Sequence, residues 1–100
     1  GKLKKMRTFQ CGTNNITIIP KEIGNCKNLE FFDCSNNKIT EIPKEIGECE
    51  NLEIFDCRDT NITEIPREIM KCKKLKKINY PEGITFKIDE RIFYIFKTSN

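Results

Sequence analysis

One pattern of residues recurs along the chain at a fixed interval. Complete copies occupy residues 6–28, 29–51 and 52–74, and a degenerate fourth copy begins at Leu75. Adjacent complete copies share 13 of 23 positions, and no linker separates them. Self-similarity at a fixed period of this length is typical of solenoids, in which each copy stacks on the next. The sequence therefore predicts a single repeat domain over residues 1–100, elongated and suited to binding.

The first half of each copy predicts a strand followed by a tight turn. In the second copy, Phe32 and Cys34 flank Asp33. Such alternation is typical of a strand with one face buried, so Phe32 and Cys34 are expected to point inward. Asn37 follows, and its amide can satisfy backbone groups of the turn.

The second half of the copy predicts a short helical turn. Pro43 suits the first position of a helical or 3₁₀ turn, where no backbone N–H is needed. Ile46 and Cys49 lie three residues apart and would form the inward side of that turn. Gly47 lies between them, and we expect the chain to reverse there.

The six cysteines fall into two columns, at positions 6 and 21 of the repeat. Reduced cysteine is a small hydrophobe that is readily buried, so we expect core thiols. A disulfide between neighbouring copies and a metal site are the alternatives, although the chain has no CxxC pair and no His. Buried free thiols indicate a reducing compartment, which predicts a cytoplasmic protein. The columns are Cys11, Cys34, Cys57 and Cys26, Cys49, Cys72.

Charge and hydropathy disfavour several classes of function. The net charge is +3 and a third of the residues are charged, so no basic face dominates as it would in a dedicated nucleic-acid binder. The lysine-rich run 71–77 is expected to be a solvated edge; contact with an acidic partner, a phosphoinositide or RNA is the alternative. No apolar run approaches the roughly 20 residues that a membrane-spanning helix needs.

The pattern LxxFxCxxNxIxxIPxEIGxCxN, held by three copies, resembles the 23-residue leucine-rich repeat of intracellular Ras-binding scaffold proteins and their plant relatives. The resemblance covers residues 1 to about 85. It implies an α/β right-handed solenoid with a parallel β-sheet on the concave face and short helical or 3₁₀ turns on the convex face. It also implies a protein-interaction role, with no enzymatic chemistry and no cofactor. Thr60 replaces the position-9 Asn in the third copy and is expected to bond the turn more weakly.

The candidate binding residues lie at positions that would face outward on the concave sheet. Phe31 beside Ile54 would form a small apolar step, and such centres often anchor protein partners. Single exposed apolar residues are also ordinary on protein surfaces. The acidic residues around this step favour a partner with basic groups. The predicted partner-binding residues are Phe31, Asp33, Ile54, Asp56, Arg58 and Lys77; the alternative is a structural spacer of a larger repeat protein without its own ligand.

Asp33 and Asp56 also raise the question of a shared cation or proton. At equivalent positions of neighbouring strands they would stand about 5 Å apart. Paired carboxylates at that distance occur in glycosidases. A flat sheet face offers no pocket to exclude water, however, and no His is present as a base. We therefore expect neither a catalytic nor a metal site.

The two ends of the chain differ. Residues 1–6 align with residues 47–52, so the chain begins inside a repeat. Either it belongs to a longer array, or another chain covers the N-terminal edge, which would allow self-association. At the other end, Ile84, Phe86 and Ile88 alternate like a strand, and Asp89 could start a short helix. Residues 84–100 are expected to form a lid over the last repeat; a docking segment is the alternative.

Overall fold

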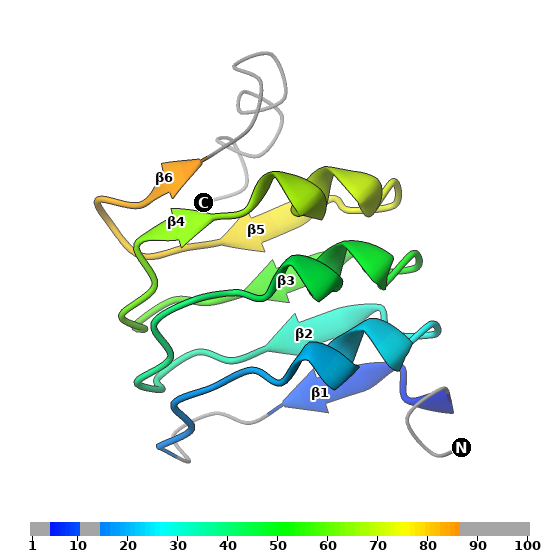
Figure 1. The fold of residues 1–100 in the computed structure, drawn as a ribbon, viewed down its shortest axis with the longest axis horizontal. Helices are drawn as coiled ribbons and strands as arrows, with labels where there is room; N and C mark the ends of the chain where they lie inside the picture. Colours follow the sequence, from blue (N-terminus) through cyan, green and yellow to red (C-terminus); the bar gives the residue numbers. More distant parts are fainter. Residues whose placement is uncertain (1–4, 11–14, 87–100) are drawn as a thin grey trace.

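The structure, a computed structural model, describes residues 5–10 and 15–86. Each repeat forms one coil, and the coils stack side by side along one direction (Figure 1). Figure 1 also shows two layers: the strands β1, β2, β3 and β5 form one, and short helices form the other. The predicted solenoid with strands on one side and short 3₁₀ turns on the other is confirmed.

The main sheet has four parallel strands in the order β1-β2-β3-β5. The strands are β1 (Thr8–Gln10), β2 (Phe31–Asp33), β3 (Ile54–Asp56) and β5 (Lys77–Asn79). Their register advances by one repeat at each step, so that Phe9 pairs with Phe32 and Phe32 with Phe55. Parallel neighbours need a crossover connection between them. The remainder of each repeat supplies it.

Three 3₁₀ helices form the opposite layer: η1 (Lys21–Asn25), η2 (Lys44–Glu48) and η3 (Arg67–Lys71). A proline with extended backbone precedes each helix, and for η2 this is Pro43, with φ −66° and ψ 148°. Pro43 therefore caps the helix and lies one residue before the position that the sequence predicted. The helix ends at Glu48, and the backbone N–H of Cys49, the residue after it, donates to the carbonyl of Ile46.

The expected chain reversal at Gly47 is wrong, because Gly47 lies inside η2. A Cβ added at this position would collide with the backbone carbonyl oxygen of Glu68 in η3. Gly47 is thus required by the close approach of two neighbouring helices. Met70 occupies the same position of η3. No further helix follows η3 among the described residues, so nothing in the described part of the chain prevents a side chain there.

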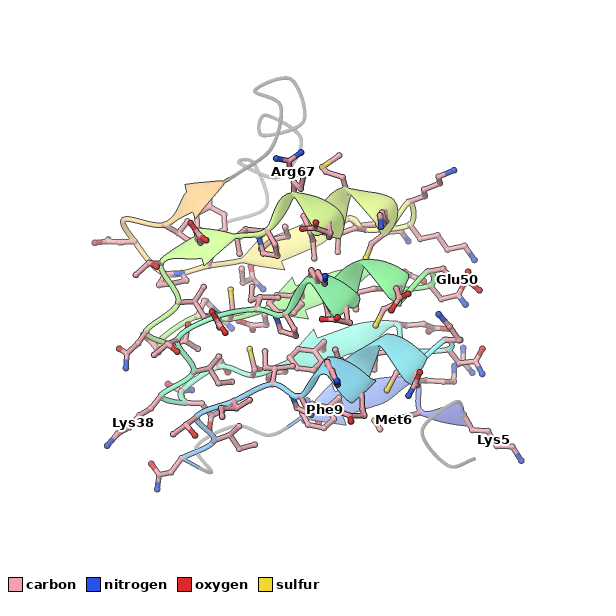
Figure 2. All side chains as sticks on the ribbon, in the orientation of Figure 1. Lys5, Met6, Phe9, Lys38, Glu50 and Arg67 are labelled. Carbon is pink, nitrogen blue, oxygen red and sulfur yellow. The ribbon has the colours of Figure 1, made fainter. Side chains whose placement is uncertain are left out.

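The core lies between the two layers and includes a column of stacked phenylalanine rings. Phe9 and Phe32 have ring centroids 4.9 Å apart, and Phe32 and Phe55 have centroids 5.1 Å apart, with planes within 7° of parallel. Stacked rings at this spacing follow directly from the strand separation. Figure 2 shows Phe9 and Met6 at one end of the stack of coils. Phe32 and Phe55 are fully buried, whereas Phe9 is half-buried.

The five described cysteines are free and buried, so the prediction of core thiols is confirmed for them; Cys11 lies outside the described residues. The Sγ atoms of Cys49 and Cys72 donate to the carbonyl oxygens of Ile23 and Ile46, each at 3.2 Å, in the preceding coil. Burial raises the pKa of Cys49 to about 12 and that of Cys72 to about 11. The thiols therefore stay protonated and link neighbouring coils.

Asn37 closes the turn after β2, as predicted. Its Nδ2 donates to the carbonyls of Cys34, at 3.1 Å, and Ser35, at 2.9 Å. Its Oδ1 accepts the backbone N–H of Ile16 in the preceding coil at 2.9 Å. A single buried amide thus satisfies one turn and joins it to its neighbour.

Thr60 takes the place of Asn37 in the next coil. Its hydroxyl donates to the carbonyl of Cys57 at 2.8 Å and accepts the N–H of Ile62 at 3.4 Å. The prediction that Thr60 continues the turn bonding is confirmed. Both bonds stay within its own coil and the second is long, so the substitution is also the weaker arrangement.

The last described segment forms a small second sheet. Strand β4 (Glu64–Ile65) pairs in parallel with β6 (Thr85–Phe86). A strand was predicted here, and the structure confirms its start. Fewer residues separate Ile65 from its partner Phe86 than separate Phe55 from its partner Ile78 in the main sheet. Residues 87–100, with the rest of the predicted lid, lie outside the described residues.

Candidate partner-binding face

The outward side chains of the four strands form the surface that the sequence selected for binding. Buried residues such as Phe32 and Phe55 alternate with residues whose side chains point away from the helices. We call this outer surface the sheet face. The strand residues on it are Thr8, Gln10, Phe31, Asp33, Ile54, Asp56, Lys77 and Asn79.

Phe31 and Ile54 form the apolar centre of the sheet face. They pair in register on adjacent strands, and both are half-buried. Thr8 pairs with Phe31 on one side and Lys77 pairs with Ile54 on the other, and both are exposed. The structure therefore places the predicted apolar step at the middle of the sheet, between two polar neighbours.

Asp56 is buried, which the sequence did not indicate. Its side chain pairs with Arg58: Nε lies 3.0 Å from Oδ1 and Nη2 lies 2.8 Å from Oδ2. The backbone N–H of Arg58 also donates to Oδ1, at 3.2 Å. With Asp56 only 4% exposed, its main effect is to hold the Arg58 guanidinium in place on the surface.

Asp33 has a similar local role one coil earlier. Its Oδ1 accepts the backbone N–H of Ser35 at 2.9 Å and the Ser35 hydroxyl at 2.6 Å. This is an Asx turn, in which an aspartate bonds the backbone two residues later. An aspartate at the end of a strand, directly before a turn, was the sequence signal for this role. Asp33 remains half-buried, with part of its surface on the sheet face.

The loop end of the sheet face is acidic. Asp56 raises the pKa of Arg58 above its ordinary value, mainly through their hydrogen bonds, and Asp33 and Asp59 raise it further. Three carboxylates thus act on one guanidinium, which leaves an excess of negative charge. Asp59 is exposed and has a positive φ of 54°. A basic group approaching this end would be attracted.

The opposite end of the sheet face is neutralised by ion pairs between coils. Arg7 Nη2 lies 2.9 Å from Glu30, and Lys76 Nζ lies 3.1 Å from Glu53. Exposed pairs of this kind stabilise a protein by at most about 1 kcal/mol each. They do cancel the charges of Glu30 and Glu53, which in the sequence belong to the acidic residues around the apolar step. The acidic character is therefore confined to the loop end.

The structure bears directly on two further features, a metal site and a membrane-spanning helix. Within residues 5–10 and 15–86, no three His, Cys, Asp or Glu side chains are grouped so that they could hold a metal ion. Both Asp56 oxygens are bonded to Arg58, so they are not directed at a cation shared with Asp33. No helix in the described residues is long and apolar enough to cross a lipid bilayer.

Comparison with known proteins bears on the fold. A family model described as Leucine Rich Repeat matches residues 28–49. A solved leucine-rich-repeat protein from Leptospira interrogans superposes with a TM-score of 0.77 and 34% identity, over 95% of this chain and 24% of that one. The chain therefore spans about a quarter of the length of that protein. A search of curated proteins gave no match. The matching family model, the related structure and the observed coils together show that the chain has the leucine-rich-repeat fold.

Proposed function

We propose that the sheet face binds a protein partner. Leucine-rich repeats are in general protein-interaction modules, and both the family and the related structure point to a repeat protein without enzymatic activity. The observation that carries the proposal is the paired, half-buried Phe31 and Ile54 at the middle of the sheet. Binding energy at protein interfaces is concentrated in a few apolar or aromatic residues near the centre.

The partner is expected to carry a basic group beside an apolar one. The acidic loop end of the sheet face lies next to the apolar centre. Asp33 follows Phe31 by two residues on β2, so it occupies the next outward-facing position of that strand. Arg58 is paired with Asp56, but Asp33 and Asp59 add negative charge around this pair. A lysine or arginine of the partner would be steered to this end, and the attraction would weaken with salt.

The test is affinity capture from a lysate, followed by binding measurements with the captured protein. We expect Phe31→Ala to weaken binding about tenfold, since a central aromatic contact contributes more than about 1 kcal/mol. Asp33→Asn removes the charge but keeps the oxygen that accepts from Ser35, and should weaken binding to a basic partner at low salt. Lys44→Glu, on the helix side, is the matched control. Unchanged affinity in both sheet-face variants would contradict the proposal.

The second candidate function is a structural spacer within a longer repeat protein. The observation that favours it is coverage, because the chain matches only 24% of the related structure. A spacer would capture no protein through the sheet face, and Phe31→Ala would change nothing. The likeness to Ras-binding scaffold proteins stays a prediction, and the same capture experiment would test it.

We also infer that the protein works in a reducing compartment, as the cytoplasmic prediction requires. Support comes from the five free buried thiols, three of which have pKa values raised to about 11 or 12. Mass spectrometry of the protein from its native source, alkylated before denaturation and again after it, would test this inference. Recovery of these cysteines as disulfides would contradict it.

A further inference from the structure

Five lysines gather where the third coil turns from η3 into β5. All five side chains are exposed, whereas Cys72 and Leu75, which lie between them in the sequence, are buried. We call this surface the lysine rim. It faces sideways from the stack of coils, in line with the equivalent turns of the first and second coils (Figure 1). Its residues are Lys71, Lys73, Lys74, Lys76 and Lys77.

The repeat does not require lysine at any of these five positions. In the second coil the same positions hold three glutamates, an asparagine and an isoleucine, a charge of −3. In the first coil they hold one lysine, one glutamate, two asparagines and a phenylalanine, with no net charge. The charge of +5 is therefore a property of the third coil and not of the fold. The equivalent residues are Asn25, Lys27, Asn28, Glu30 and Phe31 in the first coil and Glu48, Glu50, Asn51, Glu53 and Ile54 in the second.

Pairing with the second coil accounts for only part of this charge. Lys76 Nζ lies 3.1 Å from Oε1 of Glu53. Lys74 Nζ donates to Oδ1 of Asn51 at 2.8 Å, and this partner is neutral. No ion pair or hydrogen bond joins the side chain of any of the other three lysines to a described residue. Four of the five ammonium groups thus lack a carboxylate partner within the described part of the chain.

Acidic residues of the second coil limit the width of the lysine rim. Glu48 and Glu50 stand at the positions equivalent to Lys71 and Lys73, and both are exposed. Equivalent positions of adjacent coils are only about 5 Å apart, because the coils are joined by neighbouring strands. A broad anionic surface, such as a lipid bilayer or a nucleic-acid duplex, would meet these glutamates together with the lysines. A single extended chain can follow the third coil alone.

A polypeptide fits the lysine rim better than a single nucleic-acid strand does. Proteins that bind single strands combine a basic groove with aromatic side chains on which the bases stack. No aromatic side chain that the structure describes is exposed. The lysine ammonium is a compact charge on a flexible stem and can meet carboxylates from many directions. Lys76 with Glu53 is already such a pair at this rim.

We propose that the lysine rim docks an acidic polypeptide segment of a partner protein. The segment follows the turn from η3 to β5, and its carboxylates pair with Lys71, Lys73 and Lys77. Contacts of this kind steer a partner to the surface and weaken as salt is raised. Lys77 also lies on the sheet face, but docking at the rim requires neither Phe31 nor Ile54. The proposal therefore does not depend on the proposed function.

The probe is a labelled peptide of eight glutamates, which carries negative charge and no apolar side chain. Fluorescence anisotropy with the full chain should show binding that weakens as salt is raised. The double variant Lys71→Gln, Lys73→Gln should weaken binding about threefold or more, because two exposed ion pairs are lost. Its fold should persist, since Asn25, Glu48 and Glu50 stand at the equivalent positions.

The matched control is the double variant Lys21→Gln, Lys38→Gln, which removes the same charge from other exposed positions. Figure 2 shows Lys38 on the side of the coils opposite to Glu50, which lies on the turn next to the lysine rim. At 0.15 M salt, charges more than about 8 Å away are largely screened. The control should therefore bind the peptide as the wild type does.

Four results would overturn the proposal. The first is failure of the wild-type chain to bind the peptide, and the second is an equal loss in both double variants, which would make net charge the cause. The third is tighter binding to an eight-nucleotide oligothymidylate or to phosphatidylserine vesicles than to the peptide. The fourth is a wild-type chain that dimerises in sedimentation while Lys71→Gln, Lys73→Gln stays monomeric, because the occupant would then be a second copy.

One further variant separates this proposal from the proposed function. Phe31→Ala should leave the affinity for the glutamate peptide unchanged, because the peptide has no apolar side chain to place on the sheet face. Loss of peptide binding in Phe31→Ala would place the peptide there and would contradict docking at the lysine rim. Conversely, Lys71→Gln, Lys73→Gln leaves Phe31 and Ile54 in place, so failure of the rim proposal leaves the sheet face untouched.

Discussion

The first and third coils of this solenoid are made from nearly the same repeat, yet they differ at single positions. At the third coil, β6 pairs with β4, and Met70 replaces the glycine that the first and second coils carry. At the first coil, Phe9 lines an apolar cavity, and Ile18 is exposed where the other coils have glutamate. The repeat specifies the interior, and single departures from it set these two coils apart. Those departures are therefore the residues to test.

The largest expected effect comes from alkaline pH, which compares the thiols of the second and third coils with the thiol Cys26 of the first coil. Burial raises the pKa of Cys49 and Cys57 from an ordinary 9.0 to about 12, and that of Cys72 to about 11. Between pH 9 and these values the folded chain holds protons that the unfolded chain has lost. The stabilisation is complete below pH 9 and is lost as pH rises through 11 to 12. Urea denaturation at a series of pH values measures it.

A matched pair of variants isolates the thiols from other groups that titrate at alkaline pH. Cys49→Val removes one interior thiol, so the free energy of unfolding should fall less steeply between pH 8 and 11 than in the wild type. Cys26→Val, in the first coil, should change the slope less. Equal slopes in the wild type and Cys49→Val would mean that the interior is not dry.

The phenylalanine column tests the same contrast by packing. Phe55→Ala is expected to cost about 3–5 kcal/mol, because a fully buried ring leaves a cavity in the core. Phe9→Ala should cost about 1–2 kcal/mol, because its ring is half-buried and its site opens to the surface. Chemical denaturation gives both values. A cost for Phe9→Ala as large as that for Phe55→Ala would show that the Phe9 ring is as well covered as the Phe55 ring.

The glycine position is expected to give a smaller effect than the buried ring of Phe55. Gly47→Ala should cost about 1–3 kcal/mol, since its Cβ would press on the carbonyl of Glu68 in rigid backbone. At Gly24 the nearest atom to an added Cβ is the flexible end of Glu48, at 2.7 Å, so Gly24→Ala should cost less. Met70→Ala, at the equivalent position of η3, serves as the control: it shortens a half-buried side chain without pressing on a backbone carbonyl, so it should cost about 1 kcal/mol. A neutral Gly47→Ala would contradict the close approach of η2 and η3.

Much of the fold was predictable because every coil obeys the same local rules. Phe32 and Cys34 were placed inward from alternation alone, and both are buried. Asn37 and Thr60 were expected to bond their turns, and they do. The role predicted for Gly47, a chain reversal, was wrong, because a collision with Glu68 in the next coil cannot be predicted from a local sequence pattern.

The candidate site was less predictable. Its location followed from the repeat, and the pairing of Phe31 with Ile54 is confirmed. The roles of its charged residues could not be predicted from the repeat, because they depend on which other side chain of the protein each one reaches. Asp56 binds Arg58, and Glu30 and Glu53 are paired with Arg7 and Lys76. The sequence supplied the acidic residues, whereas the structure shows which of them are paired with a basic side chain.

The amino-acid sequence alone thus determined the period of the solenoid, the side of each strand that faces the core and the two columns of thiols. It could do so because each of these depends on residue spacing within one copy. The tertiary structure decided which groups are neutralised, why the glycines are needed and which large hydrophobic side chain of the described residues is exposed. Those depend on contacts between residues of successive repeats, such as the Cys72 thiol with the Ile46 carbonyl, which form only when coils stack.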